Sequence, residues 1–345
     1  MPELRLDPLT GLRAIIAGER ASRPGAFSSK IVERRPIDPA QDPFAEGNED
    51  RTPPEVWALR RDGGAPDTPG WQVRVVPNLY PALTPEGGVT PLHEGDSGAA
   101  AADDPMRSGR GMPQLFVSRP AVGGHEVIIN SPKPVGSLVD LAPEEVETAM
   151  DAWRMRMNAH SDSPYAHLIV NEGAEAGASL PHTHSQLYAL PFVPAAIARE
   201  RERFTAYFER TQGRNLLGDL LQEEVRLRDR IVAIDSEAVV ICPFASRMPF
   251  EMMLIPRTPR ARFQDEGPLG AKLLHVSLSR LQSALGGLPP LNMWIRTAPS
   301  GAGEFCWHLD VLPRLAQLAG LEMGTGVSLN IVPPETAASQ LRDAT

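Results

Sequence analysis

A short segment in the middle of the chain combines residue types that suit chemistry on a phosphate group. His182, His184 and Gln186 occupy alternate positions, and residues 173–179 before them are rich in Gly, Ala and Ser. Alternate residues of a β-strand point to one face, so the three side chains would lie together beside the small-residue loop. Backbone N–H groups of such a loop can hold phosphate oxygens while an imidazole attacks phosphorus. The segment therefore predicts a site for transfer of a phosphorus-centred group.

Two simpler explanations fit the same spacing. Two histidines and a glutamine could line a polar sheet face without any catalytic role. His182 and His184 could also bind a metal ion, but the sequence offers no convincing further ligands, and neither Cys242 nor Cys306 belongs to a Cys-x-x-Cys pair. The loop directly before the histidines and the glutamine directly after them favour the catalytic interpretation.

The elements around this segment follow from hydrophobic periodicity. Residues 166–171 predict the strand that enters the loop, and residues 186–190 predict the strand that leaves it. Pro143 and two following glutamates suit the first turn of a helix. Apolar residues at helical spacing should form its buried stripe, namely Val146, Met150, Trp153 and Met157.

The order strand, strand, helix, strand, glycine loop, strand appears twice along the chain. The second copy is predicted at residues 238–241, 250–255, 273–285, 292–297 and 305–312. Each copy places a histidine near its last strand, His184 in the first and His308 in the second. We therefore predict a duplicated α+β fold with antiparallel sheets and flanking helices. Residues 1–50 and 84–124, rich in turn-forming residues, are predicted to be irregular.

Composition restricts the classes of partner. The 345 residues include 34 Lys and Arg against 43 Asp and Glu, a formal net charge of −9. This balance argues against nucleic acid and anionic membranes as partners. Two cysteines suit a reducing compartment, and no apolar run is long enough for a signal peptide or a membrane span. We expect a cytoplasmic protein.

Further segments along the chain carry a resemblance. They are Arg34–Pro36, Asp42–Glu49, Val73–Leu83, His125–Pro132, Pro243–Glu251, Trp307–Arg314, Gly324–Gly326 and Pro334–Glu335. Together with residues 180–186, which are similar to an HPHxQ active-site motif, they resemble the galactose-1-phosphate uridylyltransferase family of the histidine-triad superfamily. The resemblance implies two histidine-triad-like units with half-barrel sheets. The first unit, residues 1–192, would hold the catalytic motif, and residues 193–345 would form linking helices and the second unit.

The resemblance also implies roles for single residues. His184 would be the nucleophile, and the backbone carbonyl of His182 would orient it. Substrate contacts are implied for Arg35, Asn78, Asn171, Gly177, Ser179 and Gln186. Of these, Arg35, Ser179 and Gln186 would lie near the phosphates, and Asn78 would lie near the base or ribose.

The reaction implied by the resemblance is a ping-pong exchange. UMP would pass from UDP-glucose to His184 and then to a hexose 1-phosphate such as galactose 1-phosphate. One alternative is an adenylyl-transferring phosphorylase or hydrolase of ADP-sugars or dinucleoside polyphosphates. Another is a nucleotide-sugar binder that has lost catalysis. The expected partners are a nucleotide sugar and a sugar 1-phosphate, with a homodimer as a further possibility because the family often dimerises.

Metal ligands of the family are missing at key positions. The positions of its zinc ligands hold Asp42, Ala45, Pro134 and His182, and two of these carry no donor. A second family metal site corresponds to Glu200, Arg296, His308 and Asp310, where an arginine would repel a cation. We therefore expect neither a metal nor another cofactor, and we expect His308 and Asp310 to form a hydrogen-bonded pair.

Overall fold

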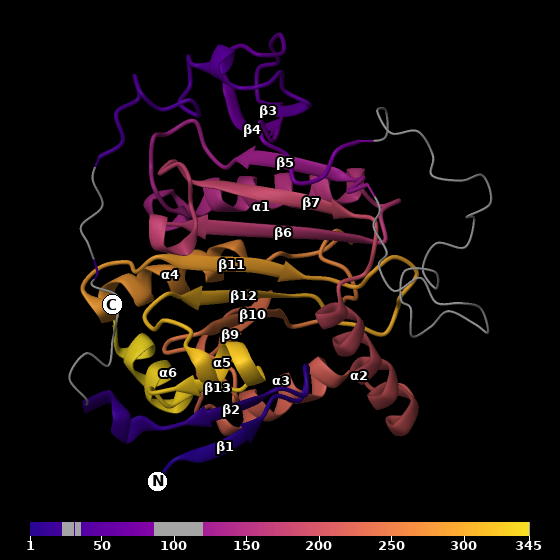
Figure 1. Ribbon diagram of the computed structural model, residues 1–345, viewed down its shortest axis with the longest axis vertical. Coiled ribbons are helices and arrows are strands. Elements are labelled where there is room, and N and C mark those ends of the chain that lie inside the picture. Colours follow the sequence, from indigo (N-terminus) through magenta and orange to yellow (C-terminus); the bar gives the residue numbers. More distant parts are fainter. Residues whose placement is uncertain (23–30, 32–35, 86–119, 345) are drawn as a thin grey trace.

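A sheet of ten antiparallel strands is the central element of the computed structural model, which describes residues 1–22, 31, 36–85 and 120–344 (Figure 1). In chain order the strands are β3 (Trp57–Arg60), β4 (Trp71–Pro77), β5 (Gly124–Ile129), β6 (Tyr165–Glu172), β7 (His184–Leu190), β8 (Ile231–Ile234), β9 (Ala238–Ile241), β10 (Met252–Pro256), β11 (Leu291–Arg296) and β12 (His308–Pro313). In space they follow the order β3-β4-β5-β7-β6-β11-β12-β10-β9-β8.

The strand order shows that the fold is duplicated. The first half reads β3-β4-β5-β7-β6 and the second half reads β8-β9-β10-β12-β11, each from the edge of the sheet to its centre. Along the chain, each half has one long helix between its third and fourth strands. The helix α1 (Pro143–Ala159) lies between β5 and β6, and α4 (Ala271–Leu285) lies between β10 and β11. The halves meet where β6 pairs with β11 and Asn171 lies opposite Asn292. The predicted duplicated α+β fold is confirmed, and the predicted division at residue 192 falls between β7 and α2 (Ala195–Thr211).

Helices cover both faces of the sheet. On one face, α1, α4 and α6 (Pro334–Asp343) bury their apolar residues against strands of both halves (Figure 1). On the other face, α2 and α3 (Leu216–Leu227) cover the second half, where Phe204 and Leu217 share a cluster with Val239 and Ile255. None of the helices in these described ranges is both long enough and apolar enough to cross a membrane.

The predicted site lies on the face that carries α2 and α3. Directly paired residues of antiparallel strands share a face, and one row of pairs runs across the sheet. That row is Gln186, Ile169, Trp294, Asp310 and Met253. Met253 belongs to the cluster under α2 and α3, so Gln186 projects from the same side. The duplication thus places the histidine of each half on one continuous face.

The predicted stripe of α1 is confirmed and is linked to the site. Val146, Met150, Trp153 and Met157 are all fully buried. The helix begins at a proline, and the Glu145 carboxylate accepts a hydrogen bond from the N–H of the preceding cap residue. The Trp153 indole N–H donates to the side-chain oxygen of Asn130, which also accepts from the hydroxyl of Ser185 on β7. The helix core therefore supports the strand that carries the motif.

The prediction that residues 1–50 are irregular was wrong in part. The chain begins with β1 (Glu3–Leu6) and β2 (Arg13–Ile16), and β2 pairs with β13 (Ser328–Asn330) near the other end of the chain. Strands this short carry little periodicity, and β13, the third strand of this sheet, is distant in sequence. No local pattern therefore identifies them. The short edge strands β3 and β8 were also missed. Most of the predicted loop at 84–124 lies outside the described residues.

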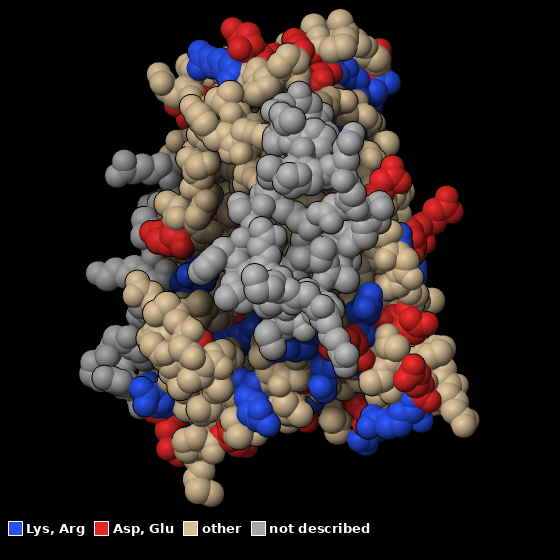
Figure 2. Space-filling view, turned by 45° about the vertical axis from the view of Figure 1, so that its right-hand side comes forward, with Lys and Arg blue, Asp and Glu red and all other residues tan. Residues whose placement is uncertain are grey.

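Charged side chains of both signs are interspersed on the surface. Figure 2 shows basic residues among acidic ones over the lower part of one face. In α3, Arg226 and Glu223 form an ion pair in which both side chains are exposed. Such exposed pairs each add little to stability, about 0–1 kcal/mol. The expectation that the chain binds no nucleic acid stays a prediction.

The core packing of α1 gives a stability test. We expect Met150→Ala to lower the free energy of unfolding by about 2–5 kcal/mol, because it removes a fully buried side chain and leaves a cavity. Met155 lies on the same helix and is 49% exposed, so Met155→Ala should change that free energy by less than about 0.5 kcal/mol. Denaturant unfolding of both variants measures the difference, and equal losses would contradict this packing.

Candidate active site

His184, the first residue of β7, has its ring fixed by a backbone carbonyl. Its Nδ1 lies 2.7 Å from the oxygen of His182, and because a carbonyl only accepts, Nδ1 carries the proton. The Nε2 atom of the neutral ring then keeps a lone pair. Burial lowers the pKa of His184 below its usual value, and the bond to the carbonyl only partly opposes this shift. The side chain is 4% exposed and meets the Phe44 ring edge to face, with ring centroids 5.2 Å apart.

The ring of His182 is held at both nitrogens. Its Nδ1 lies 2.6 Å from Oδ2 of Asp42, and its Nε2 lies 2.8 Å from the carbonyl oxygen of Ser131. The carbonyl requires a proton on Nε2, so a second proton must be shared between Nδ1 and the carboxylate. Asp42 and His182 are both buried, at 4% and 1% exposure. This paired group fixes the backbone whose carbonyl orients His184.

The residues at the predicted zinc position do not fit that metal. Asp42 and His182 use their facing atoms on each other, and Ala45 and Pro134 supply no ligand atom. Within the described ranges, no three His, Cys, Asp or Glu side chains are arranged to hold a metal ion. These residues therefore give a metal no part in the chemistry of this site, and the expectation that the protein needs no cofactor stays a prediction.

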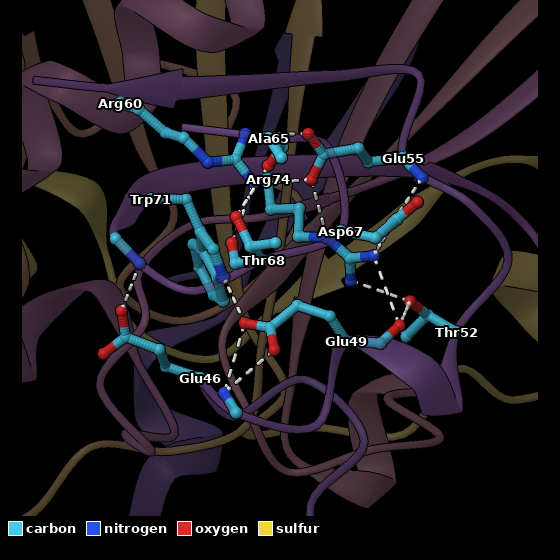
Figure 3. A network of polar contacts seen from close by, with 12 residues as sticks. Glu46, Glu49, Thr52, Glu55, Arg60, Ala65, Asp67, Thr68, Trp71 and Arg74 are labelled. Atoms are coloured by element: carbon cyan, nitrogen blue, oxygen red, sulfur yellow. Dashed lines mark hydrogen bonds and ion pairs between the residues drawn. The ribbon is translucent and has the colours of Figure 1, made fainter. Parts of the chain in front are cut away.

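A buried polar network holds the segment that carries Asp42 (Figure 3). Arg74 on β4 is 1% exposed and pairs with Glu55 at 3.1 Å and with Asp67 at 2.5 Å. Its guanidinium also donates to the backbone oxygen of Glu49, and the Trp71 indole N–H donates to the carboxylate of the same residue at 2.8 Å. Phe44 packs with residues of β4 and β5. Ion pairs and packing thus fix this segment against the sheet.

Gln186 and Asn78 meet around a histidine that the sequence analysis did not single out. His125 Nε2 lies 3.1 Å from Oε1 of Gln186 and also 3.1 Å from Nδ2 of Asn78. The N–H of Asn78 donates to the backbone oxygen of His125, and the hydroxyl of Tyr188 donates to Oε1 of Gln186 at 2.9 Å. The signal for His125 is the strand register, which sets it opposite Tyr188.

The glycine loop differs from the prediction in its backbone. The N–H groups of residues 176, 177 and 178 bond to carbonyls of residues 173 and 174 inside the loop, so they are not free for a phosphate. The N–H groups of Ser179 and Leu180 have no partner among the described residues and remain available as donors. Gly177 has φ of +88°, a left-handed conformation that favours glycine.

Three further residues are predicted from the sequence to contact the substrate. Asn171 accepts a hydrogen bond from Asn292 at 2.8 Å, across the junction of the two halves. Ser179 is exposed and lines a cavity of about 1160 Å³ with Asp42 and Leu180. His184 and Gln186 are not part of that cavity wall, so we assign the cavity no catalytic role. Arg35 lies outside the described residues.

The second half repeats the histidine geometry but surrounds it with charges. His308 Nδ1 lies 3.2 Å from the carbonyl oxygen of Cys306, two residues earlier, as in His184. Its Nε2 lies 3.5 Å from the buried carboxylate of Glu200. Arg296 pairs with Glu200 at 3.0 Å and with Asp310 at 3.3 Å. The predicted hydrogen-bonded pair of His308 with Asp310 is wrong, because the two ring nitrogens of His308 face the carbonyl of Cys306 and the carboxylate of Glu200 instead.

Comparisons with known proteins agree with this geometry. A family model described as galactose-1-phosphate uridyl transferase, N-terminal domain, matches residues 1–194. An ADP-glucose phosphorylase of Arabidopsis thaliana is 31% identical over 99% of this chain and 93% of its own length. The chain belongs to the galactose-1-phosphate uridylyltransferase family. A probable galactose-1-phosphate uridylyltransferase of Drosophila melanogaster is 27% identical over 99% of this chain and 95% of its own length.

A solved structure extends the likeness to the fold. The crystal structure of an ADP-glucose phosphorylase from Arabidopsis thaliana with bound ADP-glucose matches with a TM-score of 0.77 and 28% identity, covering all of both chains. The protein is therefore an enzyme of the galactose-1-phosphate uridylyltransferase family, whose members transfer nucleotidyl groups. The names of these relatives include both uridylyl transfer and phosphorolysis of ADP-glucose, so family membership alone does not identify the base or the acceptor.

The Asp42–His182 contact leads to a prediction about zinc. We expect the purified protein to contain well under one zinc per chain, because two donors that bond to each other cannot complete a zinc shell. A chelator should leave both the melting temperature and the activity unchanged. Elemental analysis and thermal unfolding with and without chelator are the measurements. Stoichiometric zinc whose removal lowers the melting temperature would contradict this prediction.

The burial of His184 leads to a prediction about pH. Attack requires the neutral ring, and burial lowers the pKa of His184 below its ordinary value near 6.5. The single-turnover rate of transfer to the enzyme should therefore reach half of its neutral-pH value at a pH below about 6.5 and fall further at lower pH. Quenched-flow rates across pH, with the pKa of His184 measured by NMR, test this. A rate that is halved well above the pKa measured for this ring, or that stays constant well below it, would contradict the prediction.

Proposed function

We propose that the enzyme transfers the nucleotidyl group of a nucleoside diphosphate glucose to His184. In this step, Nε2 of His184 bonds to the α-phosphorus while the bond from that phosphorus to the bridging oxygen breaks. Glucose 1-phosphate leaves with the bonding electrons. As the bond forms, positive charge develops on the ring, and the carbonyl of His182 stabilises it through Nδ1–H. The observation that carries the proposal is this 2.7 Å hydrogen bond, which leaves Nε2 as the reactive atom.

Inorganic phosphate is the acceptor that we favour for the second step. A phosphate oxygen would attack the same phosphorus, break its bond to Nε2 of His184 and release a nucleoside diphosphate. Support comes from the ADP-glucose phosphorylase of Arabidopsis thaliana that is 31% identical over nearly the whole chain, and from the crystal structure of an ADP-glucose phosphorylase of that organism with bound ADP-glucose. On the basis of these two similarities, we propose phosphorolysis of ADP-glucose as the reaction.

Uridylyl exchange is the second candidate. Here a hexose 1-phosphate such as galactose 1-phosphate would replace inorganic phosphate, and UDP-glucose would replace ADP-glucose. It is the function that the sequence analysis favoured, and the family description and several relatives at 25–29% identity support it. Both candidates share the covalent step at His184, so one experiment separates them by the mass of the label.

The decisive experiment is mass spectrometry of the protein after incubation with ADP-glucose or UDP-glucose. We expect an AMP label on His184 that disappears on adding phosphate, with formation of ADP. His184→Asn should lose labelling and turnover by at least about a thousandfold, because the nucleophile is gone. A UMP label discharged by galactose 1-phosphate would instead support the second candidate.

A matched control is available in the second half. His308 occupies the corresponding strand position and has the same bond to a carbonyl two residues earlier. His308→Asn should keep the label on His184, although its stability can fall because a buried ring is lost. Labelling of a folded His184→Asn protein at a wild-type rate would refute the proposed nucleophile.

A further inference from the structure

The side-chain amide of Gln186 has a defined orientation. Two groups approach its Oε1, namely the hydroxyl of Tyr188 at 2.9 Å and Nε2 of His125 at 3.1 Å. With Oε1 occupied by protein donors, the amide has only its two N–H groups left to offer. Those N–H groups suit an anionic oxygen.

The tautomer of His125 decides this orientation. The backbone N–H of Ala82 donates to its Nδ1 at 3.0 Å, so the proton of the neutral ring must be on Nε2. Of the two groups near Nε2, only Oε1 of Gln186 can accept that proton, because the nearby atom of Asn78 is an amide nitrogen. The opposite orientation of Gln186 would place its NH₂ group against an N–H. Burial of His125 lowers its pKa, which favours the neutral ring.

The two aromatic rings are themselves fixed. His125 on β5 and Tyr188 on β7 are direct partners in the strand register, and their rings stack with centroids 4.1 Å apart at 24°. His125 is buried, at 8% exposure. A stacked pair on two central strands has little freedom to move, so both donors keep their positions relative to Gln186.

We propose that His125 and Tyr188 are positioning residues that aim the Gln186 amide NH₂ at a phosphate oxygen of the nucleotide. His184 and Gln186 lie two residues apart on β7 and share a face, so an α-phosphate at Nε2 of His184 is within reach of that amide. The inference rests on the proposed function, since it assumes a phosphorus-centred reaction at His184. It adds two residues that act only through Gln186.

A double-mutant cycle tests this inference. Tyr188→Phe removes one donor and keeps the ring, and Gln186→Met removes the amide and keeps much of the volume. Tyr188→Phe alone should slow single-turnover labelling about threefold to tenfold, the effect of one net hydrogen bond. In the Gln186→Met background the same change should have no further effect, because nothing remains to be oriented. An equal loss in both backgrounds would overturn the inference.

A charge variant adds an independent measurement. Gln186→Glu keeps an oxygen for His125 and Tyr188, but its second oxygen would face the phosphate and repel it. Labelling by Gln186→Glu should therefore be slower than labelling by Gln186→Met. Equal or faster labelling would show that the amide nitrogen does not face the phosphate.

The control and the second readout separate this inference from the proposed function. Tyr207→Phe removes another tyrosine hydroxyl bond, made to Asp219 at 2.6 Å between α2 and α3, and should leave the labelling rate unchanged. If the wild-type protein forms no label, the proposed function fails. In that case the dissociation constant of ADP-glucose is measured by calorimetry for the wild type, the two single variants and the double variant. A coupling free energy between Tyr188 and Gln186 in binding supports the inference. Its absence overturns the inference.

Discussion

The hydrogen bond from Nδ1 of His184 to the backbone carbonyl of His182 is the constraint on which the site depends. It fixes the tautomer, and the tautomer decides which nitrogen can react. A carbonyl two residues earlier is a reliable partner only if its own peptide cannot rotate. Here Asp42 and Ser131 hold the His182 ring at both nitrogens, and pairing of β7 with β5 and β6 holds the backbone that follows. The N-terminal segment that supplies Asp42 therefore belongs to the structure that orients His184, although it lies far away in sequence.

Ion pairs take the places where the family resemblance implies metals. A buried carboxylate and imidazole can hold two segments together, but each loses hydration and needs its partner to remain buried. The Asp42–His182 contact meets this condition, and the Arg74 network secures the segment around it. In the second half, Arg296 supplies a positive charge between the carboxylates of Glu200 and Asp310. A guanidinium that is part of the chain cannot dissociate, so these contacts do not depend on the supply of an ion.

The features predicted from the sequence are those encoded locally. His184 and Gln186 share a face because they lie two residues apart on one strand, and the α1 stripe follows from helical spacing. The partnership of His125 with Tyr188 depends instead on the register between β5 and β7, which no short segment specifies. The same holds for β2, whose partner β13 comes from the far end of the chain. The prediction of free loop N–H groups was wrong only for residues 176–178, because composition identifies a turn but not which donors the turn uses itself.

Duplication gives the two halves of the sheet the same histidine geometry in different surroundings. Both halves orient a histidine through a carbonyl two residues earlier, so this geometry belongs to the shared fold and not to catalysis alone. The surroundings of the histidine Nε2 atom differ between the two halves. In the second half, Glu200 on α2 faces that nitrogen, and Arg247 adds a second guanidinium beside Asp310, leaving a cavity of only about 50 Å³. In the first half, α2 and α3 follow β7 in the chain but pack on strands of the second half. The same strand geometry thus faces buried charges in one copy, and in the other its histidine shares a face with the uncharged polar side chains of Gln186 and Asn171.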